Sequence, residues 1–179
     1  MAANWTACTD HPDCAGEVRC DQANGFCADG VLYVAEWARV LRWPLAEAMA
    51  ALDGSGPQLA VGPANVYVDH LPTADGGHHA WKFIRIGPDG LLYVPVGSPC
   101  NICVVDSHGN PIDDQSVFGS ILRVPEAGGT YDEAVPEWKY AFGIRNTVGF
   151  DWHPNAPHDL FFTGAQFCNI ARATATSRA

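Results

Sequence analysis

Arg145 and Asn146 stand side by side between two apolar runs in the stretch YAFGIRNTVGFDWHP, residues 140 to 154. A charge and an amide in so apolar a setting need a partner. A guanidinium matches a carboxylate through two parallel hydrogen bonds and stays charged when water is removed. The pair is therefore a candidate binding site, although a loop cap or a buried aspartate would also satisfy Arg145.

Two more pairs have side chains that can do chemistry. His78 and His79 follow two glycines, and imidazole is the side chain that titrates near neutrality without help from its surroundings. Alternatively, both histidines are plain solvated loop residues. Cys100 and Cys103 form a C-x2-C pair, which is a metal or redox spacing. Because no second pair accompanies it, a local disulfide or two structural thiols is favoured over zinc.

The first 27 residues are rich in cysteine, which suits an oxidising compartment. The odd total of seven cysteines leaves at least one thiol unpaired or paired to another chain. A small metal knuckle is an alternative, although the spacings are irregular for zinc. The residues concerned are Cys8, His11, Cys14, Cys20 and Cys27.

Composition narrows the class of protein. A chain of 179 residues with 47% hydrophobic and 17% charged residues is expected to form one globular domain. A net charge of -10 would repel a phosphate backbone, so nucleic acid is excluded as a partner. No apolar run approaches the roughly 18 residues of a membrane span. The start, MAANWTACTDHPDC, lacks the basic and apolar regions of a signal peptide, so a soluble chain without an export signal is expected.

Short apolar runs separated by turn residues predict an all-β fold. Only PLAEAMAALDG, residues 44 to 54, looks helical, with Pro44 in the first turn and Gly54 at the end. Strands are predicted at 31–37, 40–43, 64–70, 81–86, 91–96, 120–124, 147–152 and 160–163.

The chain also contains a repeat. FCADGVLYVAE (26–36) and IGPDGLLYVPV (86–96) share an Asp-Gly turn that leads into Leu-Tyr-Val, and WHPNAPHDLFFT (152–163) is a looser third copy. A four-stranded unit that recurs with variable insertions is typical of a β-propeller. Propellers usually need four to eight blades, so three copies predict only part of one.

Three stretches carry a resemblance to a known family: GGHHAWKFIRIGPDGLLYVPVGSPCNIC (76–103), SILRV (120–124) and YAFGIRNTVGFDWHP (140–154). Together they resemble the soluble glucose/sorbosone dehydrogenases, quinoproteins that hold pyrroloquinoline quinone in a six-bladed propeller. The resemblance implies a partial six-bladed β-propeller of about three blades in residues 28–165. A Cys-rich segment, 1–27, precedes it, and a non-homologous tail, 166–179, expected to be disordered, follows.

The resemblance also implies roles for single residues. Arg145 and Asn146 are expected to contact the quinone, through its carboxylates and a ring oxygen respectively. His79 is expected to act as general base, taking the proton of the anomeric hydroxyl while hydride leaves C1 of the sugar for the quinone. His78 competes for that role if the register is off by one. Gln22, in DQANGF, is expected to face the cofactor, with a plain turn residue as the alternative.

Two departures from the family pattern bear on activity. Ser98, in GSPCNIC, stands where glucose-oxidising members have an acidic residue, which is similar to the sorbosone-type branch. After LFFT the family continues with a segment that helps to bind Ca2+, whereas this chain reads GAQFCNIARATATSRA, without the acidic oxygens that calcium needs. A fragment that binds the quinone weakly and folds poorly alone is therefore expected.

The sequence thus predicts a quinone-dependent aldose or sorbosone dehydrogenase-like protein, with a small sugar as substrate and with catalysis lost if the ring is incomplete. The alternative is a non-catalytic propeller module for protein interaction. Open blade edges favour self-association in either case. Family members are usually periplasmic or extracellular, and because no signal peptide is visible the compartment stays open.

Overall fold

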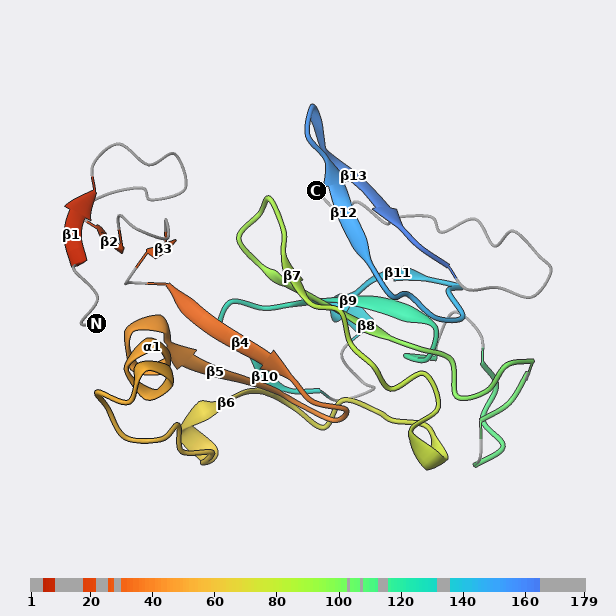
Figure 1. The fold of residues 1–179 in the computed structure, drawn as a ribbon. Helices are drawn as coiled ribbons and strands as arrows, with labels where there is room; N and C mark the ends of the chain where they lie inside the picture. The colour runs from red at the N-terminus through yellow and green to blue at the C-terminus, as the bar shows by residue number, and fades with distance from the viewer. Residues whose placement is uncertain are drawn as a thin grey trace. The chain divides into compact units, whose positions relative to one another are not determined.

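In the computed structural model of the 179-residue chain, the regular secondary structure is mostly β-strand, with one α-helix among the described residues (Figure 1). The all-β prediction is confirmed at this level: the strands form several separate sheets, mostly antiparallel, and no described sheet closes on itself. The chain divides into two compact units, Met1–Val34 with Leu41–Val66, and Ala35–Val40 with Tyr67–Ala179. The structure describes residues 5–8, 18–21, 26–27, 30–102, 104–106, 108–112, 116–131 and 136–164.

The first unit contains a small three-stranded sheet and the helix. The helix α1 (Leu45–Asp53) begins one residue later than predicted, because Pro44 precedes it in an extended conformation. Gly54 ends the helix in the left-handed conformation with φ 76°, as predicted. The other elements are the antiparallel strands β1 (Trp5–Cys8), β2 (Val18–Asp21) and β3 (Phe26–Cys27), most of β4 (Val31–Ala35) and β5 (Val40–Pro44), and the 3-10 turn Pro63–Asn65.

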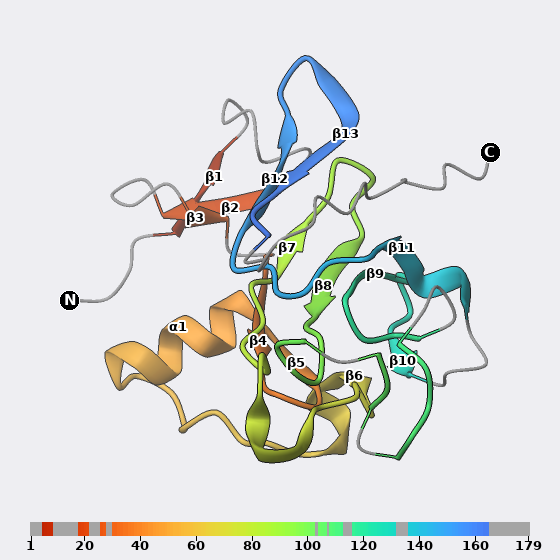
Figure 2. The ribbon, with the colours of Figure 1, turned by 90° about the vertical axis from the view of Figure 1, so that its right-hand side faces the viewer.

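The described strands outside the three-stranded sheet form two four-stranded sheets and one hairpin. The first sheet has the strand order β10-β6-β5-β4, and the second has the order β11-β9-β8-β7. A hairpin, β12 with β13, forms a separate two-stranded sheet, drawn in blue in Figure 2. The bounds are β6 (Val66–Asp69), β7 (Arg85–Ile86), β8 (Leu92–Val96), β9 (Ser120–Val124), β10 (Gly129–Thr130), β11 (Lys139–Phe142), β12 (Phe150–His153) and β13 (Ala156–Phe162).

Strands β8 and β9 are buried on both faces. Every residue of β8 is buried, and Arg123 is the exception in β9. The continuous apolar run of β8 is what a strand covered on both sides requires, since alternate side chains point to opposite faces. On one face a cluster packs between this sheet and the hairpin: Tyr93, Ile121, Ala141, Ile144 and Phe150.

The Asp-Gly turn of the repeat has a structural role before β8. Asp89 Oδ1 accepts a hydrogen bond from the Leu91 amide (3.1 Å), and Asp89 Oδ2 accepts one from the Tyr93 hydroxyl (3.0 Å). Gly90 takes φ 77°, where glycine has no steric penalty. In this copy, the Asp-Gly-x-Leu-Tyr pattern thus fixes a turn and the position of the buried Tyr93 in β8.

Most predicted strands are confirmed, but not all. The run 81–86 forms a strand only at Arg85–Ile86; Phe83 instead packs edge-on against Phe150, with ring centroids 5.4 Å apart. Five strands were not predicted: β1, β2, β3, β10 and β11. Within the described residues, no helix has both the length and the apolar surface to cross a membrane. The predicted tail 166–179 and most of the Cys-rich segment lie outside the described residues.

Candidate functional site

Three loops of the second unit meet at one edge of the sheet β11-β9-β8-β7. Residues 97–101 follow β8, 143–149 follow β11, and 78–79 precede β7. The antiparallel register explains why: Val96 pairs with Ser120, and Ser120 pairs with Phe142, so β8 and β11 end at the same edge. Strand β7 begins toward this edge, because Arg85 pairs with Tyr93. Segments far apart in sequence are therefore neighbours here.

The backbone of Ser98 joins the other two loops. Its amide donates to the Arg145 carbonyl (2.7 Å), and its carbonyl oxygen lies 2.8 Å from Nδ1 of His79. A carbonyl can only accept, so Nδ1 of His79 must carry the proton. The Nε2 atom of a neutral His79 is then the basic nitrogen with a lone pair. Hydrogen bonding to Ser98 thus selects the tautomer that a general base needs.

His79 is held in a costly backbone conformation and is partly buried. Its φ of 52° lies in the left-handed region, which non-glycine residues occupy rarely. Burial lowers the pKa of His79, and the nearby His78 and Arg145 lower it further, whereas the bond to Ser98 opposes the shift. The imidazole is consequently neutral at pH 7 and able to accept a proton.

His78 is engaged differently. Its Nε2 lies 3.1 Å from Asn101 Oδ1, which also accepts a hydrogen bond from Nη2 of Arg145. Because the amide oxygen accepts, the Nε2 atom of His78 is protonated. The two imidazole rings lie 4.0 Å apart. Of the two histidines, His79 therefore has its Nε2 lone pair available, and His78 does not.

Gly97 separates His79 from Asn146. A Cβ placed on Gly97 would lie 2.5 Å from His79 Cβ and 2.7 Å from its carbonyl oxygen, and 3.3 Å from Asn146 Oδ1. The first two distances are shorter than real Cβ contacts, so any side chain at residue 97 would displace His79. Because residue 97 has no side chain, His79 and Asn146 can both lie close to its backbone.

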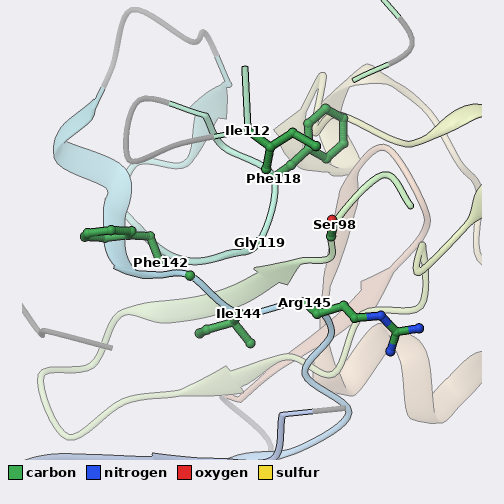
Figure 3. A pocket seen from close by; sticks show the side chains of 8 residues that line it. Ser98, Ile112, Phe118, Gly119, Phe142, Ile144 and Arg145 are labelled. Carbon is green, nitrogen blue, oxygen red and sulfur yellow. The ribbon is translucent and has the colours of Figure 1, made fainter. Parts of the chain in front are cut away.

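A pocket of about 260 Å³ lies beside the backbone of Arg145. Its walls are largely apolar, and Figure 3 shows that the Arg145 guanidinium extends away from Phe142 and Ile144. The pocket and the cationic end of Arg145 therefore do not coincide. The lining residues are Ser98, Ile112, Phe118, Gly119, Phe142, Gly143, Ile144 and Arg145.

The structure brings together three of the residues singled out from the sequence, His79, Arg145 and Asn146. Gln22 lies outside the described residues. Cys100 is disulfide-bonded, and because Cys103 lies outside the described residues a disulfide within the C-x2-C pair stays a prediction. In the part of the chain that is described, no three His, Cys, Asp or Glu side chains are grouped to hold a metal ion.

Sequence reasoning missed Gly97 and Asn101. The CNIC spacing drew attention to the loop, but only to its cysteines, and nothing local indicates that Asn101 contacts a residue 44 positions away. Comparisons of the sequence with known protein families and with curated proteins gave no match. Function is therefore inferred from the polar groups of the site: the guanidinium of Arg145 and the side-chain amides of Asn101 and Asn146 can donate to carboxylate and carbonyl oxygens, and Nε2 of His79 can accept a proton.

Proposed function

We propose that the chain is a quinone-dependent sugar dehydrogenase-like protein, similar to the glucose/sorbosone dehydrogenases, and that its sheets belong to a six-bladed propeller of which about three blades are represented. Two four-stranded sheets followed by a two-stranded hairpin support this proposal, since a propeller blade is a four-stranded sheet. The substrate class is an aldose or sorbosone.

The observation that carries the proposal is the state of His79 next to Arg145. A neutral imidazole with its basic Nε2 atom available is held near a guanidinium whose charge contributes to the lowered pKa of His79. In this proposal His79 is the general base and Arg145 binds an anion at the same edge of the sheet. Sugar oxidation by hydride transfer needs both, because base and hydride acceptor must flank the same carbon.

The residues of the site fit pyrroloquinoline quinone by their chemistry. Arg145 would pair with a carboxylate of the quinone, and the amide of Asn146 would donate to a ring oxygen. Gln22 is proposed as a further contact on the resemblance alone. When bound, the quinone supplies the acceptor for the hydride that leaves C1 of the sugar. No residue of the chain is assigned to Ca2+, which the family uses.

His79 moves the proton in this proposal. Its Nε2 atom accepts the proton of the anomeric hydroxyl while the C1–H bond breaks, so that C1 becomes a carbonyl carbon. The Ser98 carbonyl continues to accept from Nδ1 and stabilises the imidazolium that forms. Its role is comparable to that of any group that orients a catalytic histidine through the second ring nitrogen.

The test uses the full chain with added pyrroloquinoline quinone and Ca2+, with aldoses or sorbosone and an artificial dye as electron acceptor. We expect dye reduction by the wild type, a loss of at least about 100-fold in His79→Ala, and a small effect in the matched control His78→Ala. Quinone binding, followed by absorbance, should persist in both variants. Normal turnover in His79→Ala would refute the assignment of the base.

An interaction module without catalysis is the second candidate. It is supported by the disulfide at Cys100 and by exposed apolar side chains on the second unit, with Trp81 82% and Ile102 86% exposed. This candidate predicts that the wild type does not bind quinone at any usable concentration. It also predicts concentration-dependent self-association in sedimentation experiments.

A further inference from the structure

We propose that Asn101 is a positioning residue, which orients the Arg145 guanidinium toward a bound anion and holds the His78 imidazole beside it. The inference deepens the proposed function and rests on it for the identity of the ligand. Its basis is a set of contacts within the protein. They are all made by one loop, which follows β8.

A single atom makes both contacts. Asn101 Oδ1 accepts from Nη2 of Arg145 and lies 3.1 Å from Nε2 of His78. A carbonyl oxygen has two lone pairs and can accept both bonds. The orientation of the amide is determined as well, because the guanidinium has only donors, and the nitrogen of the amide could not face it. Asn101 therefore fixes a cation and the protonated nitrogen of an imidazole relative to each other.

An amide is better suited to this task than a carboxylate. Arginine has a long flexible side chain, and holding its guanidinium in advance reduces the entropy lost when a ligand binds. Aspartate at residue 101 would also orient the guanidinium, but its negative charge would compete with the carboxylates of a ligand. The neutral Asn101 orients Arg145 without adding a negative charge beside the guanidinium.

The backbone around Asn101 is anchored on the side toward β8. The Ser98 amide donates to the Arg145 carbonyl (2.7 Å), so the two loops are joined through their backbones. The adjacent residue, Cys100, is disulfide-bonded. The side chain of Asn101 is exposed, yet the loop that carries it is tied to the loop that carries Arg145. Such an arrangement can keep the side chains of Asn101 and Arg145 in contact.

The first readout needs no ligand. In the full chain labelled with 15N-histidine, long-range 15N–1H NMR spectra report which ring nitrogen of His78 carries the proton. We expect the Nε2-protonated tautomer in the wild type and in Asn101→Asp, which keeps the acceptor, and a tautomer mixture in Asn101→Ala. The matched control is Asn110→Ala, which removes a hydrogen bond to Asp106 outside the site and should leave His78 unchanged.

The second readout is the affinity for pyrroloquinoline quinone. We expect the dissociation constant to rise about tenfold in Asn101→Ala, through lost orientation, and by more in Asn101→Asp, through charge neutralisation. An unchanged His78 tautomer together with an affinity within about twofold of the wild type in Asn101→Ala would overturn the proposal. If Asn101→Ala does not fold, loss of the tautomer preference in a folded Asn101→Asp would overturn it.

Failure of the proposed function gives a different pattern. If the wild type does not bind the quinone but the tautomer of His78 depends on Asn101, the quinone assignment falls and the positioning role stands. If the wild type binds the quinone but His78 and the affinity are both unaffected by Asn101→Ala, the positioning role falls and the function stands.

Discussion

The sheet β11-β9-β8-β7 and the loops at its edge are stabilised by different kinds of contact. In the sheet, Tyr93 and Ile121 are buried in a cluster of apolar side chains that extends to the hairpin β12-β13. In the loops, single polar atoms make the contacts: one carbonyl of Ser98, one amide oxygen of Asn101. Apolar packing is non-directional and scales with area, whereas hydrogen bonds depend on the position of each atom.

This difference separates stability from geometry. Removing a buried methyl group affects the whole unit, because the cavity cannot fill completely. Removing a polar atom from the exposed loops changes the direction of one side chain and leaves most buried area intact. The sheet is therefore expected to control whether the unit folds, and the loops are expected to control the arrangement of the site.

The largest effect is expected from a substitution in the sheet. Ile121 is 0% exposed and Ile102 is 86% exposed, so Ile121→Ala and Ile102→Ala remove the same atoms from opposite environments. We expect Ile121→Ala to lower the free energy of unfolding by about 2–5 kcal/mol. For Ile102→Ala we expect a change within about 0.5 kcal/mol. Urea unfolding of both variants measures the contrast, and equal losses would end the distinction between the two regions.

Gly97 directly follows the last residue of β8, so a substitution there tests the boundary between the sheet and the loops. The new methyl group of Gly97→Ala would overlap His79, and we expect a loss of about 1–3 kcal/mol of stability from overpacking. Because burial is the main cause of the lowered pKa of His79, displacement toward solvent should raise that pKa toward its ordinary value. Titration followed by NMR measures it.

The matched control for Gly97 is Gly149→Ala in the same unit. A Cβ on Gly149 would meet only Thr163 Oγ1, at 4.0 Å, which is ordinary contact. Neither stability nor the pKa of His79 should change by much in this variant. If the pKa of His79 in Gly97→Ala stays as low as in the wild type, the loop yields to the new methyl group, and Gly97 is not what places His79.

The sheet was largely predictable from sequence and the site only in part, for a physical reason. The continuous apolar run 91–96 has few alternatives to a strand covered on both faces, and it forms β8. Strand β10 carries no such run, because its two residues pair in parallel with β6 through the backbone alone. The run 81–84 is apolar enough to predict a strand, but no ladder forms there: Trp81 is exposed, and Phe83 packs against Phe150.

In the site, some residues could be singled out from the sequence by their type, but the contacts between residues could not. His79 and Arg145 could be singled out because imidazole and guanidinium have distinctive chemistry. Gly97 and Asn101 could not, because their importance depends on neighbours in other loops, which no local pattern records. The choice between His78 and His79 likewise needed the hydrogen-bond partners, since the two differ in sequence by one position only.

Lys82 lies in the sequence between His79 and strand β7, and it gives the smallest predicted effect. It follows the site histidines closely in sequence, is half-buried, and among the described residues no carboxylate pairs with it. Burial lowers the pKa of Lys82 from 10.5 to about 8. At pH 7 the folded protein must therefore hold a charge that its surroundings disfavour, and Lys82→Met should stabilise it by roughly 1–2 kcal/mol.

The sign of the pH dependence makes this prediction specific. Between pH 8 and pH 10.5 the unfolded chain still binds the proton that folded Lys82 has released, so the stability of the wild type rises with pH in this window. The advantage of Lys82→Met should consequently shrink from pH 8 upward and vanish above pH 10.5. Lys82→Arg stays charged throughout and should show no gain at any pH. A constant advantage of Lys82→Met from pH 7 to pH 11 would mean that apolar contact, and not the buried charge, distinguishes this residue.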